Sequence, residues 1–231
     1  MHYVLSDLHG HERRFSAILE QIGFGSEDTL YVLGDVIDRH PGGLRILRRI
    51  MAMPNVHMIL GNHEYMMLRA LGHPRDDNRD DGRAVAHWYR NGGEVTHRHF
   101  KRLRKALRRE IVDYLLALPL EREVQVGKKI YHLVHGAPAG DYDGKAPYLN
   151  SVHYAVWKRL EADHPLPGDK MLVFGHTPTR HYRDIAPMEV WYGENRIGID
   201  CGCGYPEEGH DSSYGRLACL RLEDGKVYYV S

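Results

Sequence analysis

The sequence predicts an α/β fold with α+β layering, in which two packed mixed β-sheets are flanked by helices. In the first half of the chain, short apolar runs alternate with amphipathic helical patterns, an order typical of parallel strands joined by helices. The second half is rich in strand patterns. The length of 231 residues suits a single domain that spans residues 1–231.

Three strand–helix pairs open the chain. The predicted strands are 2–5, 30–34 and 56–61, and the helices that follow them are 11–22, 43–51 and 63–71. In the first helix, Phe15, Ile18 and Leu19 share one face, as a helix packed on a sheet requires. This order predicts parallel strands joined by right-handed crossovers.

A helical insertion is predicted over about 72–118. The segment 72–83 is polar and rich in charges, so it predicts a loop. Apolar residues recur at helical spacing from Phe100 to Leu118 and predict one helix over about 97–118, which Pro119 ends.

The second half carries most of the predicted strands. They are 122–126, 129–134, 171–174, 189–192, 196–199, 216–222 and 226–230, with one helix at about 151–162. Asp224 and Gly225 lie between the last two strands, and this pair of residues predicts a type I′ hairpin turn.

The composition argues against several partners. The formal net charge is zero, so no global field attracts nucleic acid, and no apolar run is long enough to predict a membrane span. Three cysteines without framework spacing, and an N-terminus without a signal-peptide pattern, predict a cytoplasmic protein. We expect neither nucleic acid nor a membrane as partner, and the oligomeric state stays open. The 17 histidines stand out, because histidine is a common metal ligand.

Five predicted strands end in side chains that can bind metal. These ends carry Asp7 and His9, Asp35, Asn62 and His63, His135, and His176. Ligands of α/β sheets gather at the carboxyl ends of strands. Any one of these side chains is more often structural, but five such ends together indicate a site. Their nitrogen and oxygen donors suit Mn, Fe, Zn or Co, and their number suits two metals that share a carboxylate.

Five motifs in a fixed order carry a family resemblance. They are SDLHGH from Ser6, GDVIDRHP from Gly34, GNHE from Gly61, VHG from Val134 and FGHTP from Phe174. This set resembles the calcineurin-like metallophosphoesterase superfamily, with its β-sandwich fold. Within that superfamily it resembles the PPP-type serine/threonine protein phosphatases, closest to the bacterial and phage-lambda-type enzymes.

The resemblance implies a role for each motif residue. Asp7 and His9 would bind the first metal, Asp35 would bridge, and Asn62, His135 and His176 would bind the second. His63 would be the general acid, oriented by Asp38, and Arg39 would bind the phosphate together with Arg159 of the Trp157-Lys158-Arg159 segment. The expected cofactor is two divalent metal ions, with Mn²⁺ first and Fe, Zn, Ni or Co as alternatives.

The implied activity is metal-dependent hydrolysis of a phosphomonoester by a two-metal-activated hydroxide. The leading hypothesis is a serine/threonine or dual-specificity protein phosphatase, whose partner is a phosphorylated protein or peptide, or a small phosphoester. The alternative is a dinucleoside tetraphosphatase or another phosphoanhydride hydrolase. We expect Asn at position 38 in that branch, so Asp38 favours the monoester. A non-catalytic metal-binding scaffold is the third hypothesis.

Three features stay without a role at this stage. His40 stands where the family motif usually has Gly. Cys201 and Cys203 lack the further ligands of a zinc site, so we expect them to be buried and inert. The basic segment 98–109 is read as the solvated face of an amphipathic helix, since its apolar residues keep helical spacing.

Overall fold

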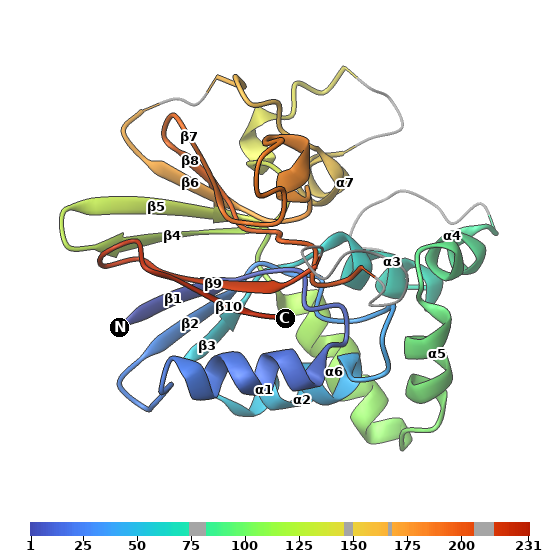
Figure 1. Ribbon diagram of the computed structural model, residues 1–231. Coiled ribbons are helices and arrows are strands. Elements are labelled where there is room, and N and C mark those ends of the chain that lie inside the picture. Colours follow the sequence, from blue (N-terminus) through green and yellow to red (C-terminus); the bar gives the residue numbers. More distant parts are fainter. Residues whose placement is uncertain (74–81, 146–149, 166–167, 206–214) are drawn as a thin grey trace.

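Two five-stranded sheets face one another, and helices cover their outer faces (Figure 1). The computed structural model describes residues 1–73, 82–145, 150–165, 168–205 and 215–231. The predicted fold of two packed mixed sheets flanked by helices is confirmed.

The first sheet joins the start and the end of the chain. Its strand order is β10-β9-β1-β2-β3, with β1 at His2–Leu5, β2 at Thr29–Val32, β3 at Val56–Met58, β9 at Leu217–Arg221 and β10 at Val227–Val230. β1, β2 and β3 pair in parallel, whereas β9 pairs antiparallel with both β1 and β10. The parallel strands therefore send their carboxyl ends to one edge.

The second sheet has the same mixture of pairings. Its order is β4-β5-β6-β8-β7, with β4 at Glu121–Val126, β5 at Lys129–Val134, β6 at Met171–Phe174, β7 at Trp191–Gly193 and β8 at Arg196–Gly198. β5, β6 and β8 run parallel, and β4 and β7 pair antiparallel at the two edges. Three parallel carboxyl ends thus point the same way here too.

The helices lie where the apolar faces of the sheets need cover. α1 (Glu12–Gln21), α2 (Gly43–Ala52) and α3 (Asn62–Ala70) follow β1, β2 and β3, and α7 (Ser151–Trp157) covers the second sheet with the short 3₁₀ helices η1 (Ala139–Asp141) and η2 (Thr179–His181). α7 is shorter than the predicted 151–162, because Lys158 turns extended with ψ 125°.

The insertion contains three helices in its described part. These are α4 (Ala84–Arg90), α5 (Glu94–Lys101) and α6 (Lys105–Ala117). The prediction of one helix over 97–118 is wrong, because Arg104 is extended at φ −62° and ψ 148° and breaks the helix there. Helical spacing misled because α5 buries Phe100 and α6 buries Ile111, so the apolar stripe crosses the break. Most of the predicted loop 72–83 lies outside the described residues.

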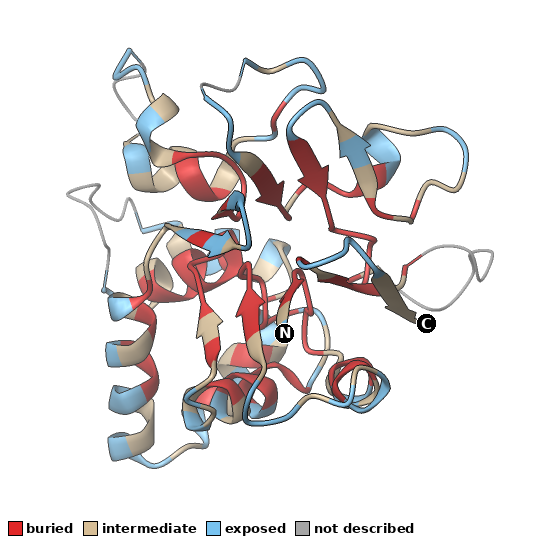
Figure 2. Ribbon diagram, turned by 90° about the vertical axis from the view of Figure 1, so that its left-hand side faces the viewer, coloured by how far each residue is buried: buried red, intermediate tan, exposed pale blue. Residues whose placement is uncertain are grey.

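The core is divided by the sheets. Side chains from both sheets, among them Val4, Leu33, Val173 and Ile197, form one cluster between the layers. A larger cluster lies between the first sheet and its helices, where Phe15 and Ile18 of α1 are fully buried. Figure 2 shows these buried residues in red along the strands and on the inward sides of the helices.

The hairpin between β9 and β10 is present, but its turn differs from the predicted one. A type I′ turn needs positive φ at both central residues. Only Gly225, at φ 74°, meets this requirement, and Asp224 does not. Among the described residues, no helix is long and apolar enough to cross a membrane. The cellular compartment stays a prediction.

Candidate metal centre

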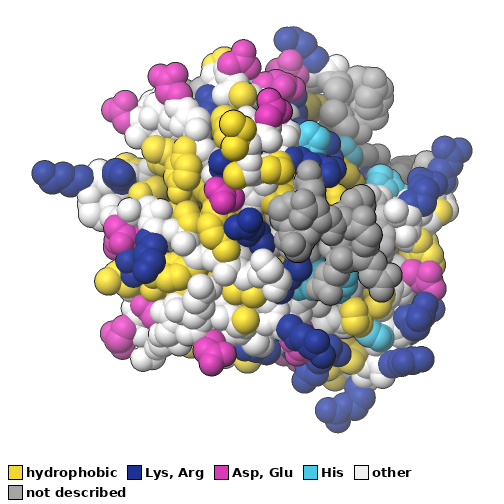
Figure 3. All heavy atoms as spheres, viewed as in Figure 1, with side chains coloured by type: hydrophobic (Ala, Val, Ile, Leu, Met, Phe, Trp, Pro, Cys, Tyr) yellow, Lys and Arg dark blue, Asp and Glu magenta, His cyan; other side chains and the backbone are white. Residues whose placement is uncertain are grey.

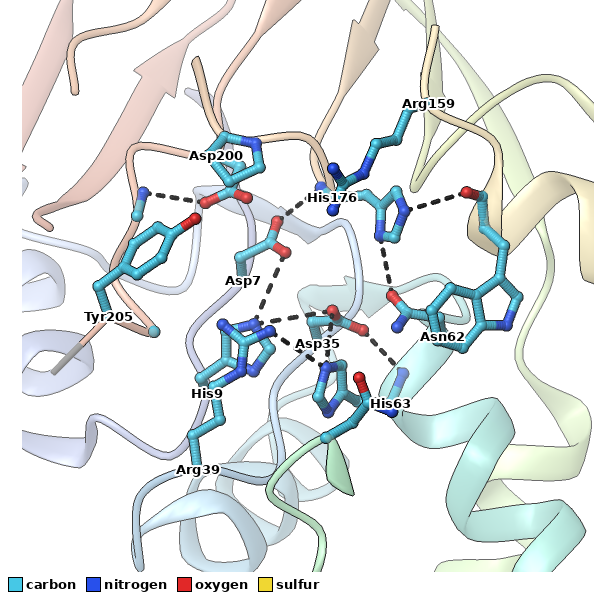
Figure 4. Close-up of a pocket in the computed structure, with 15 residues that line it drawn as sticks. Asp7, His9, Asp35, Arg39, Asn62, His63, Arg159, His176, Asp200 and Tyr205 are labelled. Atoms are coloured by element: carbon cyan, nitrogen blue, oxygen red, sulfur yellow. Dashed lines mark hydrogen bonds and ion pairs between the residues drawn. The ribbon is translucent and has the colours of Figure 1, made fainter. Parts of the chain in front are cut away.

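The carboxyl ends of five strands from the two sheets converge on one pocket (Figure 4). β1 leads to Asp7 and His9, β2 to Asp35, β3 to Asn62 and His63, β5 to His135, and β6 to His176. All of these except His135 line the pocket, and His135 is fully buried beside them. The site therefore forms only when the two sheets pack against each other.

Asp35 lies at the centre of the cluster. Its Oδ2 is 3.7 Å from Nε2 of His9 and 3.8 Å from Nε2 of His63, while its Oδ1 is 3.5 Å from Nε2 of His135. Two groups of three donors share this carboxylate, one with His9 and His63 and the other with His135 and His176. A shared carboxylate is what a bridged two-metal site needs.

Backbone carbonyl oxygens fix the orientation of three of these histidines. The contacts are His135 Nδ1 to Leu33 O at 2.6 Å, His9 Nδ1 to Ile37 O at 3.3 Å, and His176 Nε2 to Trp157 O at 3.2 Å. A carbonyl oxygen can only accept, so each of these ring nitrogens carries the proton. The second nitrogen of each neutral ring is then left with a lone pair, as a metal ligand requires.

Those lone pairs face other acceptors. Nε2 of His135 is 2.8 Å from Oδ1 of Asn62, and Nδ1 of His176 is 3.0 Å from the same oxygen. One nitrogen of each ring already donates its proton to a carbonyl oxygen. The other nitrogen of the neutral ring therefore has a lone pair, which faces a lone pair of the Asn62 oxygen. A cation among them satisfies all three groups, and imidazole with amide and carboxylate oxygen is a suitable donor set for a divalent metal. The residues present therefore fit the predicted metal ions.

The pKa shifts of the buried carboxyl groups also indicate that the pocket binds a cation. Burial by itself would raise the pKa of Asp35, but positive charge on the surrounding histidines, when they are protonated, would lower that pKa below its ordinary value. Burial, and then the Asp35 charge, raises the pKa of Asp7. Burial, and then the Asp7 charge, raises the pKa of Asp200 well above its usual range. The pocket holds more carboxylates than it can ionise without added positive charge.

Backbone strain is concentrated at this site. Six of the eight described non-glycine residues with positive φ belong to it: Asp7 (54°), His9 (42°), Asp35 (54°), Asp38 (73°), Arg39 (63°) and His176 (61°). Each such residue typically costs about 1–3 kcal/mol and persists only where its surroundings enforce it. The strand ends therefore do more than carry ligands, because they turn sharply to aim them into the pocket.

A buried carboxylate enforces the turn after β2. Glu64 accepts hydrogen bonds from the backbone N–H of Asp35 at 2.8 Å, Val36 at 2.9 Å and Ile37 at 3.3 Å. The next three N–H groups donate to Thr96 Oγ1 (from Asp38), Gly92 O (from Arg39) and Asp38 O (from His40). Every N–H from residue 35 to residue 40 thus has an acceptor. Burial, and then the Asp35 charge, raises the pKa of Glu64 to about 7.

His63 is held from the side away from the pocket. Its Nδ1 is 2.7 Å from Oδ2 of Asp38, and the same oxygen accepts a hydrogen bond from Nε1 of Trp88 at 2.8 Å. Nδ1–H therefore donates to Asp38, and Nε2 faces the pocket, 3.4 Å from Nη2 of Arg39. Burial by itself would lower the pKa of His63, but the carboxylates of Asp35 and Asp38 raise it. Such an imidazole can hold a proton for transfer.

Two arginines line the pocket together with the carboxylates and histidines. They are Arg39 and Arg159. Two glycines make room for Arg39, because a Cβ on Gly92 would lie 2.9 Å from its Cγ, and one on Gly204 would lie 2.7 Å from its Nη1. One guanidinium group can bind two phosphate oxygens at once, so Arg39 and Arg159 make the pocket suitable for a phosphate.

The structure places the ten predicted site residues in one region. Eight of them line the pocket, and the remaining two, Asp38 and His135, are fully buried in contact with those that do. Their roles stay predictions. His40 lies outside this pocket, with its ring 3.7 Å from that of His11. The expected burial of Cys201 and Cys203 is confirmed.

Sequence reasoning assigned no role to four residues that take part in the site, which are Glu64, Trp88, Asp200 and Tyr205. Glu64 stands next to His63 in GNHE, and Asp200 directly follows the predicted strand 196–199, so the strand-end rule could have found it. Trp88 opens the segment WYRNGG, which resembles a segment near the substrate cleft of the same family, but its contact with Asp38 was not predicted. Tyr205 carried no signal, because an aromatic residue in a loop is most often part of the core or the surface.

Comparison with known proteins identifies the family. Residues 3–207 match the family model described as calcineurin-like phosphoesterase. A symmetrical bis(5'-nucleosyl)-tetraphosphatase of Paracidovorax citrulli (strain AAC00-1) is 26% identical over 191 residues, which cover 82% of this chain and 61% of the relative. A protein of the same name from Acidovorax ebreus (strain TPSY) is 32% identical over 181 residues, which cover 76% of this chain and 57% of the relative.

The chain thus spans about three fifths of the length of these relatives. Among solved structures, a crystal structure described as a candidate diadenosine tetraphosphatase aligns with a TM-score of 0.65 at 17% identity, covering 99% of this chain and 92% of that one. At this identity the likeness shows the fold alone.

These relatives correct the narrower prediction. The leading hypothesis of a serine/threonine protein phosphatase is wrong, because the relatives similar over most of this chain are named tetraphosphatases of dinucleotides. The motifs misled because hydrolysis of a phosphoester and of a phosphoanhydride at a two-metal site calls for the same kinds of metal ligand and positively charged group. With a family model that matches most of its length and a donor set to suit, the chain belongs to the calcineurin-like phosphoesterase family.

Proposed function

We propose that this chain hydrolyses a phosphoanhydride bond of dinucleoside polyphosphates and cleaves diadenosine tetraphosphate symmetrically into two molecules of ADP. One observation carries the proposal: relatives 26% and 32% identical over most of this chain are named symmetrical bis(5'-nucleosyl)-tetraphosphatases. The pocket supports it, because the same donor set and arginines suit any phosphate attacked by water.

The proposed metal ligands are the strand-end side chains. They are Asp7, His9, Asp35, Asn62, His135 and His176, with Asp35 shared between the two ions. Two divalent cations bound there, with Mn²⁺ proposed, would lower the pKa of a coordinated water and neutralise phosphate charge. We further propose that residues 1–231 form a single domain.

The remaining roles belong to the chain itself. Arg39 and Arg159 bind the equatorial oxygens of the attacked phosphate, where charge must be stabilised. His63 Nε2 donates a proton to the leaving oxygen of the nucleoside diphosphate, and Asp38 holds the ring in the tautomer and orientation that this requires. The fully buried Asp38 carboxylate also keeps the resulting imidazole in place.

Asp38 does not select a monoester, contrary to the sequence-based argument. Its Oδ2 serves both His63 and Trp88, so its contacts lie on the far side of the imidazole from the pocket. An acid positioned by such a contact can protonate the leaving oxygen of an anhydride as well as that of an ester. Substrate choice must come from groups that touch the substrate.

The test uses purified chain and anion-exchange separation of nucleotides. With Mn²⁺ we expect diadenosine tetraphosphate to yield ADP alone, EDTA to abolish the reaction, and added Mn²⁺ to restore it. Parallel reactions with Ni²⁺, Zn²⁺ and Mg²⁺ rank the metals. Formation of ATP and AMP instead, or no cleavage with any of the four metals, overturns the proposal.

A further inference from the structure

Two arginines line the pocket, and the proposed function assigns both of them to the attacked phosphate. They are Arg39 and Arg159, and among the described residues neither has a carboxylate at ion-pair distance. Arg45, by contrast, pairs with Glu12 at 2.6 Å. Unpaired guanidinium groups beside a cavity favour an anionic ligand.

A third arginine, Arg180, lies next to residues that line the pocket. Arg180 belongs to η2 and follows Pro178, which itself lines the pocket. Its guanidinium carbon lies 4.6 Å from the centre of the Tyr205 ring, and Tyr205 is also a lining residue. Among the described residues Arg180 likewise has no carboxylate at ion-pair distance, whereas Arg183, one turn further, has Glu189 at 3.7 Å. A cation–π contact therefore holds Arg180 at the rim.

The three guanidinium groups act on the same region. Burial raises the pKa of Tyr205, and the charges of Arg180, Arg39 and Arg159 oppose that rise. Figure 4 shows the Tyr205 ring beside Asp200, on the side of the metal ligands where Asp7 lies. Figure 3 shows Lys and Arg side chains near histidines on the right-hand part of the face in view.

We propose that Arg180, held over Tyr205, binds oxygens of a phosphate next to the attacked one in the polyphosphate chain. The proposal rests on the proposed function. Arg39 and Arg159 serve the attacked phosphate, and a tetraphosphate chain continues past it with a negative charge on each further phosphate. A monoester ends at the attacked phosphate and has no anion to offer there. Arg180 would thus distinguish a polyphosphate chain from a simple phosphoester.

The experiment compares two substrates, diadenosine tetraphosphate and p-nitrophenyl phosphate, with the Mn²⁺-loaded chain. In Arg180→Ala we expect kcat/KM for the tetraphosphate to fall about tenfold more than that for p-nitrophenyl phosphate, mainly through KM, since one charge-assisted contact is lost. Arg180→Lys should recover part of this loss, because it keeps the charge without the planar fork. Arg109→Ala is the matched control, since Arg109 is 85% exposed on α6 and does not line the pocket.

Tyr205 provides a second, independent arm. Tyr205→Phe keeps the ring under Arg180 and should keep the ratio between the two substrates close to that of the wild type. Tyr205→Leu removes the ring and should shift the ratio in the direction of Arg180→Ala. Circular dichroism and urea unfolding establish that each variant is folded.

The outcomes separate the two proposals. Wild-type cleavage of the tetraphosphate with an unchanged ratio in Arg180→Ala overturns the role of Arg180 and leaves the proposed function intact. Wild-type turnover of p-nitrophenyl phosphate without cleavage of the tetraphosphate overturns the proposed function, and the role of Arg180 falls with it. A loss in Tyr205→Phe equal to that in Tyr205→Leu contradicts the cation–π contact.

Discussion

Nδ1 of His63 and Oδ2 of Asp38 lie 2.7 Å apart, and both side chains are buried. The contact joins the loop after β2 to the first turn of α3, and it determines which ring nitrogen of His63 faces the pocket. If His63 is the acid of the reaction, everything that holds this pair also maintains the rate.

His63→Asn should lower kcat by about 10²–10⁴-fold, because a positioned acid contributes about this factor. Metal content, measured by inductively coupled plasma mass spectrometry, should stay close to that of the wild type. Asp38→Asn is the companion variant, and a loss of about 10–100-fold is expected, since His63 remains but loses its charged partner. Unchanged kcat in His63→Asn would contradict the role of His63 as the acid.

Glu64→Gln should destabilise the fold as well as the site. The amide has one acceptor oxygen, and its NH₂ group would face a backbone N–H, so at least one buried donor loses its partner. We expect the free energy of unfolding in urea to fall by about 1–3 kcal/mol. Glu94→Gln is the control, because Glu94 pairs with Arg98 at the surface and should change that free energy by less than about 1 kcal/mol.

His11 should make stability depend on pH. Burial, together with the charges of His40 and Arg14, lowers the pKa of His11 to about 3, below the ordinary value of 6.5. At a pH between these two values, His11 binds a proton in the unfolded chain but not in the folded chain. The free energy of unfolding therefore falls as the pH drops from 6.5 towards 3. In EDTA, His11→Gln should show a shallower fall by urea unfolding than the wild type. Equal slopes in the two proteins would contradict the low pKa.

The three cysteines should be unreactive in the folded protein. Burial raises the pKa of Cys203 to about 12, and it also raises the pKa of Cys201 and of Cys219. Since the thiolate is the reactive form, a disulfide reagent such as Ellman's should label native protein only at the rate of unfolding. Urea should release all three thiols at once. A fast phase without urea would show a solvent-accessible thiol.

Much of the site was readable because it follows a topological rule. Parallel strands bring their carboxyl ends together, so Asp7, Asp35 and His176 could be assigned to one place from sequence. The same rule applies to Asp200, which directly follows the predicted strand 196–199, but it was applied to five other strand ends only. The carboxylate of Glu64 was not recognised, since its partners are backbone N–H groups that carry no residue identity.

Other errors have a local cause. Hydrophobic spacing cannot show the break between α5 and α6, because both helices keep their apolar side towards the core. The positive φ of the ligands was also not predictable, since Asp and His adopt it only when tertiary contacts enforce it. The substrate prediction failed for another reason: the motifs carry the chemistry common to phosphate hydrolysis, whereas the contacts proposed to distinguish substrates involve residues outside the motifs, such as Arg180 of η2.

The backbone N–H of His176 donates to Oδ2 of Asp7 across 169 positions of sequence. During synthesis on the ribosome, Asp7 and His9 leave the exit tunnel long before β6 is made. The Asp7 carboxylate and the His9 imidazole meet their partners from β6 only later, because contacts between residues so far apart in sequence form late in folding. High-affinity metal capture by a nascent chain therefore reports that the second sheet has docked on the first. The metal ions would then bind only after the two sheets have packed together. A ribosome-arrested chain that stops before Met171 should therefore not bind metal with high affinity.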